Sequence, residues 1–226
     1  MKYKNIKEGI FLSRPNRFIA EVQIGEKVQI CHVKNTGRCK ELLVPEARVF
    51  VEKSDNPLRK TQYNLISVYK EDKLFNIDSA APNKVFGEWV EKSGFFGKPS
   101  YIKPECKYGN SRFDFYIETE GRKIFAEVKG VTLEENGVLM FPDAPTERGV
   151  KHINELCECV KEGYEGYVAF IVQTERACCF TPNRKTHPAF ADALIKAEKC
   201  GVKILCLSCR VKKDELYIKE HVKVCL

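Results

Sequence analysis

The stretch K-I-F-A-E-V-K-G, residues 123–130, has the composition of a β-strand and carries an acid and a lysine two positions apart. Side chains of a strand alternate between its two faces, so Glu127 and Lys129 point the same way. An exposed carboxylate beside an ammonium group adds little stability and is common on surfaces. The same two groups are also half of what a hydrolytic site requires. The residues around them therefore decide between a surface ion pair and an active site.

The preceding strand, R-F-D-F-Y-I-E at 112–118, carries a second acid. If Glu120-Gly121 forms a two-residue hairpin turn, Asp114 lies opposite Glu127 on one charged face. On that face the register also pairs Arg112 with Lys129 and Tyr116 with Phe125. It predicts a second, wholly apolar face that forms the core, pairing Phe113 with Val128, Phe115 with Ala126 and Ile117 with Ile124.

Two carboxylates that face each other across a strand pair repel, and a divalent cation would remove this conflict. Mg²⁺, with Mn²⁺ as the alternative, suits two carboxylates because it keeps several waters. We therefore predict Asp114 and Glu127 as metal ligands and Lys129 as a group that assists water or stabilises phosphate charge. These are the parts of a metal-dependent phosphodiester hydrolase. The alternative is a solvated ladder of salt bridges.

A helix is predicted from Thr146, its N-cap, to Gly163. Arg148, Lys151 and His152 fall at i, i+3 and i+4 on it, one polar stripe near the helix start, where an anion is also favoured. Phosphate is the expected ligand, and a solvated helix face is the alternative. On an earlier helix, Glu88 is either a third acid near the metal or an exposed residue.

The order of the elements predicts two domains, 1–82 and 83–226, with the boundary in the segment D-S-A-A-P-N at 78–83. The first has five predicted strands and suits an OB-like β-barrel. The second reads helix, three strands, helix, strand, helix, strand, which predicts an α/β domain with a mixed sheet flanked by helices. The predicted barrel strands are 17–24, 28–33, 47–53, 63–70 and 73–78.

Composition favours a polyanion as partner. The net charge of the 226 residues is +7, and residues 1–83 hold 15 Lys and Arg against 10 Asp and Glu. Without an apolar run of 18 residues or a signal-like N-terminus, the chain is expected to be cytoplasmic, with no membrane as partner. Three of the 11 cysteines and one histidine near the end have a spacing that suggests zinc: Cys206, Cys209, His221 and Cys225. The β-rich run around Cys206 and Cys209 favours core packing instead.

Several motifs together resemble the sugar fermentation stimulation protein (SfsA) family over nearly the whole chain. They are N-T-G-R at 35–38, N-P-L-R-K-T-Q-Y at 56–63, A-P-N-K at 81–84, G-N-S-R-F-D-F at 109–115, A-E-V-K at 126–129, F-P-D-A-P-T-E-R-G-V-K-H at 141–152 and T-P-N at 181–183. The resemblance implies an OB-like domain joined to a domain of the PD-(D/E)xK nuclease type, and DNA binding.

The resemblance implies a role for each matching residue. Asp114 corresponds to the Asp of the nuclease motif, and Glu127 and Lys129 correspond to its E-x-K part. Glu88 falls where related sequences carry an acid on the first core helix. Arg148, Lys151 and His152 match the R-G-x-K-H helix. His187 stands where many relatives have an acid, so we expect a phosphate contact or a helix cap there.

The resulting hypothesis is a cytoplasmic protein that binds double-stranded DNA largely without sequence preference, with a magnesium-dependent endonuclease site. The alternatives are a non-catalytic DNA-binding regulator with a vestigial site, and a binder of RNA or single strands. The family name adds a role in regulating sugar use. The oligomeric state stays open, with a homodimer as one option. The predicted backbone contacts are Arg14, Arg17, Lys34, Arg38, Lys40 and Arg112.

Overall fold

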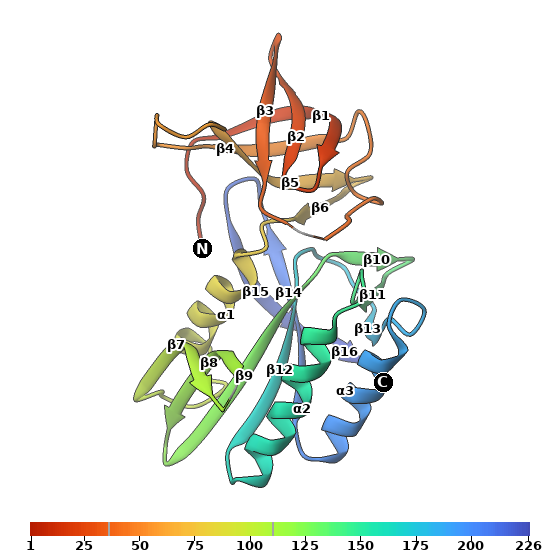
Figure 1. Ribbon diagram of the computed structural model, residues 1–226. Coiled ribbons are helices and arrows are strands. Elements are labelled where there is room, and N and C mark those ends of the chain that lie inside the picture. The colour runs from red at the N-terminus through yellow and green to blue at the C-terminus, as the bar shows by residue number, and fades with distance from the viewer. Residues whose placement is uncertain (36, 110) are drawn as a thin grey trace.

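The computed structural model describes residues 1–35, 37–109 and 111–226, and Figure 1 shows two domains, one above the other. The upper domain contains strands β1 to β6, and the lower one contains three helices and the remaining strands. Thr36 and Asn110, which belong to two of the motifs quoted above, lie outside the described residues.

Five strands of the upper domain close into a barrel, because β3 pairs with β2 on one side and with β5 on the other. The ring runs through β1, β2, β3, β5 and β4. Its interior is filled by buried apolar side chains such as Val22, Cys31 and Leu65. The strands are β1 (Ile6–Asn16), β2 (Ile19–Ile24), β3 (Lys27–Val33), β4 (Arg48–Lys53), β5 (Tyr63–Lys70) and β6 (Lys73–Asn76).

The prediction of a five-stranded OB-like barrel is confirmed, but one of the five strands was assigned wrongly. The ring includes β1, which the sequence did not predict, whereas the predicted strand at 73–78 is β6, a hairpin partner of β5 outside the ring. The segment of β1 reads I-K-E-G-I-F-L-S-R-P-N, without clean alternation. Its place is set by pairing with β2 and β4, which a local pattern does not reveal.

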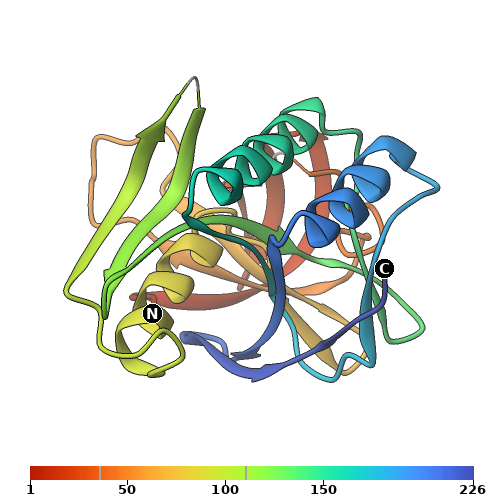
Figure 2. The same cartoon turned by 90° about the horizontal axis from the view of Figure 1, so that it is seen from below.

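The lower domain is built on a six-stranded mixed sheet in the order β15-β14-β12-β9-β8-β7. The central strands β14, β12 and β9 are parallel, and the outer ones are antiparallel. Helix α1 covers one face, and α2 with α3 covers the other (Figure 2). The helices are α1 (Ala81–Lys92), α2 (Glu147–Lys161) and α3 (Pro188–Lys199). The sheet strands are β7 (Tyr101–Tyr108), β8 (Ser111–Thr119), β9 (Arg122–Val131), β12 (Glu165–Val172), β14 (Lys203–Val211) and β15 (Leu216–His221).

This order confirms the predicted core of helix, three strands, helix, strand, helix and strand. Sequence reasoning missed a small second sheet of short strands: β10 (Leu133–Glu135), β11 (Val138–Phe141), β13 (Cys179–Pro182) and β16 (Lys223–Val224). Thr146 caps α2 as predicted, since its side chain accepts from the N–H of Gly149 at 3.1 Å. The proposed division after residue 82 falls within the first turn of α1.

Gln173, directly after β12, ties the two domains together. Its backbone carbonyl accepts from the N–H of Asn76 at 2.9 Å, and its side-chain amide donates to Asn76 Oδ1 at 2.9 Å and to the Asp78 carbonyl at 3.0 Å. All three residues are buried. The barrel is therefore joined to the sheet by buried polar contacts as well as by the chain itself.

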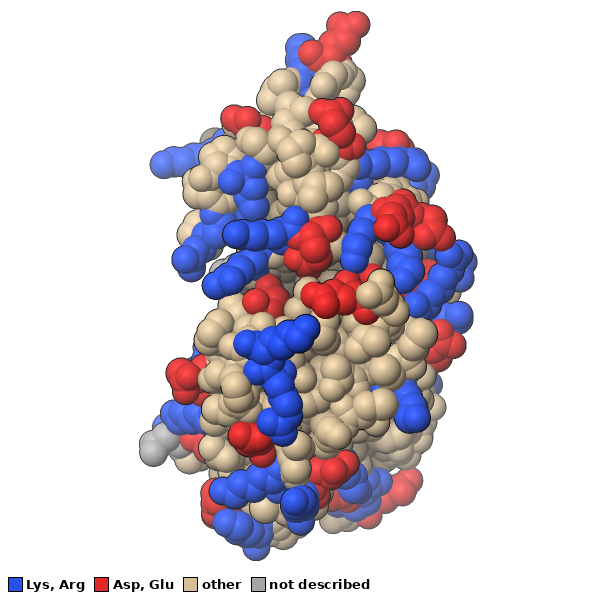
Figure 3. All heavy atoms as spheres, turned by 90° about the vertical axis from the view of Figure 1, so that its right-hand side faces the viewer, with Lys and Arg blue, Asp and Glu red and all other residues tan. Residues whose placement is uncertain are grey.

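Ion pairs continue this junction at the surface. Lys70 and Lys73 both bond the buried carboxylate of Glu134, each at 3.2 Å, and Arg176 pairs with Asp72 at 2.6 Å. Figure 3 shows basic and acidic side chains mixed at the level where the domains meet. Much of the basic charge on this side is thus already paired. Among the described residues, no helix is long and apolar enough to cross a membrane.

Candidate metal and phosphate site

The hairpin of β8 and β9 has the predicted register only over its outer part. The ladder pairs Thr119 with Arg122 and continues to Phe115 with Ala126. Beyond that pair, the Asp114 side chain replaces the backbone as acceptor, because its Oδ2 accepts from the N–H of Val128 at 2.7 Å. A carboxylate oxygen thus satisfies a backbone donor that a regular ladder would have paired with a carbonyl. The two strands separate at the predicted site.

The prediction of one apolar and one charged face was wrong. Phe125 and Glu127, on the predicted charged face, are 4% and 3% exposed because α2 packs over them. Phe113 belongs to the cluster on this side together with Phe125, whereas Phe115 packs on the α1 side. Parallel pairing of β9 with β12 places β9 inside the sheet, and α1 and α2 bury its two faces, as is usual for such sheets. The hairpin is therefore no solvated ladder.

Glu127 is the centre of the site. Its Oε1 lies 2.5 Å from Lys129 Nζ and 2.5 Å from His152 Nδ1. An ionised carboxylate only accepts, so His152 Nδ1 carries the hydrogen of this bond. Oε2 is buried and has no hydrogen-bond partner among the residues that the structure describes. Such an oxygen is costly unless something binds it.

Asp114 reaches the same site from β8. Besides the bond from Val128, its Oδ1 accepts from Asn83 Nδ2 at 2.8 Å, so the first turn of α1 also holds this carboxylate. The sequence had marked Asn83 only as part of a helix entry and of the A-P-N-K motif. The one sequence signal for this contact was the side-chain amide of Asn83 itself, at the start of a helix expected to cover the sheet.

The two carboxyl groups differ in their electrostatics. Burial raises the pKa of Asp114, and the charge of Glu127 adds to this rise, while the bonds from Val128 and Asn83 oppose it. Burial also acts to raise the pKa of Glu127, but the bond from His152 and the charge of Lys129 outweigh it and hold that pKa below its usual value. The Glu127 carboxylate is thus kept ionised, and Asp114 gains most from a nearby cation.

The predicted basic stripe on α2 is correct for two of its three members. Arg148 and Lys151 are exposed, and Lys151 lies 3.8 Å from Glu155. His152 is buried at 5% exposure and faces the sheet. Its Nε2 accepts a long bond from Arg148 Nε at 3.4 Å. His152 therefore orients Glu127 from inside, and its predicted exposed position is corrected.

Glu88 does not join the two carboxylates. It lies five residues after Asn83 on α1 and therefore points away from the Asn83 side. Its Oε2 accepts from the ammonium group of Met1 at 2.8 Å, and that group also donates to the carbonyl of Leu216 in β15. Strands β14, β12 and β9 separate β15 from β8. The predicted third acid near a metal is therefore placed elsewhere by the structure.

Arg14, predicted to contact a phosphate backbone, is used internally. Its guanidinium donates to the backbone carbonyls of Arg17, Asn35, Gly37 and Arg38 at 2.7 to 3.1 Å. These bonds fix the β1–β2 turn against Asn35, Gly37 and Arg38. Arg14 is therefore a structural residue, because both terminal nitrogens of its guanidinium are bonded to carbonyls of the fold.

The other predicted barrel cations lie nearer to solvent. Arg17 and Arg38 are exposed, as is Lys40, while Lys34 is half-buried and lies 3.7 Å from Asp78. Arg17 lies over the ring of the half-exposed Phe18, and the Arg38 backbone N–H donates to Asp143. On β8, Arg112 is exposed and pairs with Glu105 at 3.3 Å.

His187 and the cysteines have structural surroundings. His187 is buried; its Nδ1 accepts from the N–H of Thr146 at 3.3 Å, and its Nε2 lies 3.1 Å from Glu147, so it joins the starts of α2 and α3. Its side chain forms no cap bond to its own helix. Cys206 and Cys209 are buried in the clusters on opposite faces of the sheet, as strand parity predicts.

The residues present fit a divalent cation. Glu127 Oε2 is a buried, ionised and unpartnered oxygen, and Asp114 supplies a second carboxylate from the neighbouring strand. Within the described ranges, no group of three or more His, Cys, Asp or Glu side chains could hold a metal. Two carboxylates completed by water are the ligand set that suits Mg²⁺ and disfavours zinc.

Comparison with known proteins gives a consistent result over the whole chain. The family model described as the SfsA N-terminal OB domain matches residues 12–77, and the sugar fermentation stimulation protein RE domain matches residues 80–215. A sugar fermentation stimulation protein homolog of Desulfitobacterium hafniense is 60% identical over 99% of this chain and 98% of its own length. The homolog of Clostridium beijerinckii is 55% identical over the full length of both chains.

A solved structure agrees with these relatives. The structure of Pyrococcus furiosus SfsA in complex with Ca²⁺ superimposes with a TM-score of 0.90 at 30% identity, covering 100% of this chain and 98% of that one. The chain therefore belongs to the sugar fermentation stimulation protein (SfsA) family.

Proposed function

We propose that this protein binds double-stranded DNA largely without sequence preference and hydrolyses its phosphodiester bonds with a divalent cation, Mg²⁺ or Mn²⁺. Asp114 and Glu127 are the proposed metal ligands, and Lys129 is the proposed catalytic cation. The Ca²⁺ complex of the archaeal relative supports a divalent cation in this family. The link to sugar use rests on the family name alone.

One observation carries this proposal: the unpartnered Oε2 of the buried Glu127. A carboxylate kept for structure alone would be expected to have both oxygens bonded when it is 3% exposed. Here Lys129 and His152 both bond Oε1 and leave Oε2 without a partner. This asymmetry is expected of a group whose second oxygen binds a cation.

The surrounding side chains have distinct roles in the proposed reaction. A cation bound here would supply positive charge beside the scissile phosphate. Lys129 Nζ, held by Glu127, adds a fixed positive charge where negative charge grows on the phosphate in the transition state. His152 holds the Glu127 carboxylate in orientation, and Asn83 does the same for Asp114.

Groups around the site would hold the rest of the DNA. Arg148 and Lys151 lie on the exposed side of the first turns of α2, Arg148 about one turn before the buried His152 and Lys151 directly before it. Arg17, Arg38 and Lys40 are exposed on the barrel. Contacts of this kind are to phosphates and carry little sequence information. Affinity should therefore fall steeply with salt concentration.

The test incubates the purified protein with supercoiled DNA, linear DNA, single-stranded DNA and RNA, in Mg²⁺, Mn²⁺ or EDTA. Wild type is compared with Asp114→Ala, Glu127→Gln and Lys129→Ala. Lys123→Ala is the matched control for Lys129, because Lys123 is an exposed lysine of the same strand. We expect cutting of duplex DNA that requires the metal, survives in the control and is lost in the three site variants.

Cutting that persists in all three variants would come from another protein or another site and would refute the assignment. DNA binding without cutting in any metal would favour the non-catalytic regulator. Preference for RNA or for single strands would replace duplex DNA as the substrate. Each result is read together with circular dichroism of the variants, so that unfolding is not mistaken for loss of a catalytic group.

A further inference from the structure

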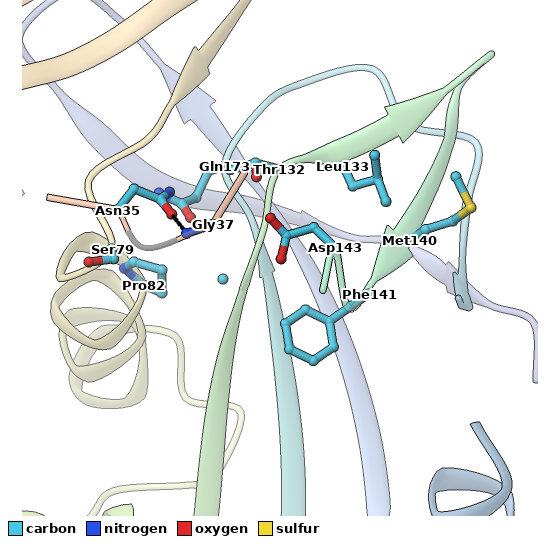
Figure 4. Close-up of a pocket in the computed structure, with 11 residues that line it drawn as sticks. Asn35, Gly37, Ser79, Pro82, Thr132, Leu133, Met140, Phe141, Asp143 and Gln173 are labelled. Carbon is cyan, nitrogen blue, oxygen red and sulfur yellow. Dashed lines mark hydrogen bonds between the residues drawn. The ribbon is translucent and has the colours of Figure 1, made fainter. Parts of the chain in front are cut away.

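A cavity of about 170 Å³ lies between the barrel and the lower sheet (Figure 4). It opens at the carboxyl ends of the parallel strands β9 and β12, where α/β sheets usually bind ligands, and Asn35 and Gly37 line it from the barrel. A water takes about 30 Å³ of liquid, so the cavity holds a few waters or one flat ring system.

The cavity adjoins the proposed catalytic site along the backbone. Gly130 lines it and directly follows Lys129 on β9. Pro82 lines it from α1 and directly precedes Asn83, the residue that bonds Asp114. Consecutive Cα atoms are 3.8 Å apart, so residues of the cavity wall and of the site are direct neighbours in two stretches of the chain.

Acceptors dominate the polar lining. Gln173 Nε2 donates to Asn76 and Asp78 in the wall, and its Oε1 lies on the cavity side, 2.7 Å from where a Cβ of Gly130 would stand. Asn35 Nδ2 donates to the Ile77 carbonyl at 3.0 Å, and its Oδ1 accepts from the N–H of Gly37 at 2.7 Å. Gln173 has therefore used both hydrogens of its amide in the wall, and its oxygen is the acceptor that faces the cavity.

Asp143 adds a charged acceptor to this lining. Figure 4 shows its carboxylate pointing into the cavity from the segment between β11 and α2. Oδ2 accepts from the backbone N–H of Arg38 at 3.0 Å, which fixes the orientation of the group. A carboxylate and an amide oxygen in the cavity lining repel a phosphate and favour a group that donates hydrogen bonds.

The remaining wall is apolar and suits a flat ring. Phe141, Met140 and Leu133 line one side and Pro82 the other. Enzymes that read an extruded nucleobase use this combination, apolar or aromatic faces for the ring and hydrogen bonds to its Watson–Crick edge. Guanine presents two adjacent donors on that edge, N1–H and the 2-amino group, which match one carboxylate. Uracil and thymine present a single N–H there.

We propose that this cavity binds a guanine base, with Asp143 as the group that reads its Watson–Crick edge. The inference rests on the proposed function, because it makes the cavity the base pocket beside the scissile phosphate. The guanine could belong to an unpaired nucleotide of a nucleic acid or to a free nucleotide. Both sources share the same chemistry at Asp143, and the experiment separates them.

The first arm titrates the full-length protein with GMP, AMP, CMP and UMP in EDTA, followed by nuclear magnetic resonance, which detects weak binding without any cutting. We expect GMP to bind at least about tenfold more tightly than UMP, the discrimination of one bidentate pair. Asp143→Ala should abolish the preference for GMP over UMP. Ser79→Trp, which fills the exposed rim of the cavity, should weaken the binding of all four nucleotides. Asp192→Ala, an exposed acid on α3, is the matched control.

The second arm measures binding of duplexes that contain one unpaired G, one unpaired T or no unpaired base. A gain for the unpaired G that is lost in Asp143→Ala identifies a nucleic-acid base as the ligand, whereas binding of GMP without that gain identifies a free nucleotide. Failure of both, or equal binding of all four nucleotides, overturns the inference. Cutting assays on the same variants keep the outcomes apart, since the nuclease can stand without the pocket and the pocket without the nuclease.

Discussion

The bond between His152 and Glu127 gives the sharpest test of the site. His152→Ala removes one of the two partners of a carboxylate that is 3% exposed and already has one unpartnered oxygen. A hydrogen bond to a charged group contributes about 1.5–3 kcal/mol. Because little water reaches the group, we expect a loss of roughly 2–3 kcal/mol in the free energy of unfolding. For a chain of this size that lowers Tm by about 4–10 °C.

A double-mutant cycle separates this bond from the packing of the imidazole. Wild type, His152→Ala, Glu127→Gln and the double variant are unfolded in urea and by heat, in EDTA so that metal binding does not contribute. The coupling energy should be about 1.5 kcal/mol or more if the two side chains stabilise each other. His152→Asn, whose amide can replace Nδ1 as donor, should recover part of the loss.

Additive effects, with a coupling energy below about 0.5 kcal/mol, would refute the reasoning. They would mean that His152 contributes only packing and that Glu127 is held by Lys129 alone. The same series checks the metal assignment. Mg²⁺ or Mn²⁺ should raise the Tm of wild type and leave that of Glu127→Gln nearly unchanged, because the variant lacks the anionic oxygen that binds the cation.

Three further predictions concern the scaffold. Arg14→Ala should lower the free energy of unfolding by about 2–3 kcal/mol and Arg14→Lys should not restore it, since a single ammonium cannot reproduce four bonds to carbonyls; chemical denaturation measures both. The bond from Arg122, aided by Lys203, lowers the pKa of Glu165 to about 2. The stabilisation that the Glu165 carboxylate gives the fold is therefore complete above the pKa of the unfolded chain and is lost as pH falls from about 4.5 to about 2. Because solvent screens this partly exposed group, the stabilisation amounts to about 1 kcal/mol. Melting curves of wild type and Glu165→Gln, recorded at several pH values, measure it. Gly130→Ala should cost about 1–3 kcal/mol, because its Cβ would meet Gln173 and Pro82 at 2.7 and 2.8 Å, and unaltered stability would contradict the packing described there.

Most of the fold could be predicted because each element has a local signal. Alternating strands with turns, a capped helix at Thr146 and the order of strands and helices were enough for a barrel followed by a mixed sheet. Strand β1 was missed because its pattern is irregular and one of its two neighbours in the sheet, β4, is distant in sequence. The short strands β10, β11 and β13 were missed because three or four residues carry too little periodicity.

The site was predicted in its members more than in its geometry. Asp114, Glu127 and Lys129 do lie together, as the shared hairpin implies. The two-faced hairpin was wrong because β9 lies inside the sheet, between β8 and β12, and α1 and α2 bury its two faces. A contact such as Asn83 with Asp114 depends on how α1 crosses the sheet, which no spacing within one element specifies.

The burial of His152 could have been predicted from the sequence. It has the spacing of the exposed Arg148 and Lys151, but it also continues the series Gly149, Ile153 and Leu156, which recurs at i, i+3, i+4 and i+7 and is buried throughout. A histidine that fits both the polar and the apolar stripe of a helix lies at their border, where its ring can be buried while one nitrogen meets a charged group. On a helix that packs over a strand with an inward-facing acid, that border position predicts a histidine–carboxylate pair. The basic stripe and the acidic strand are then two sides of one site, joined through His152.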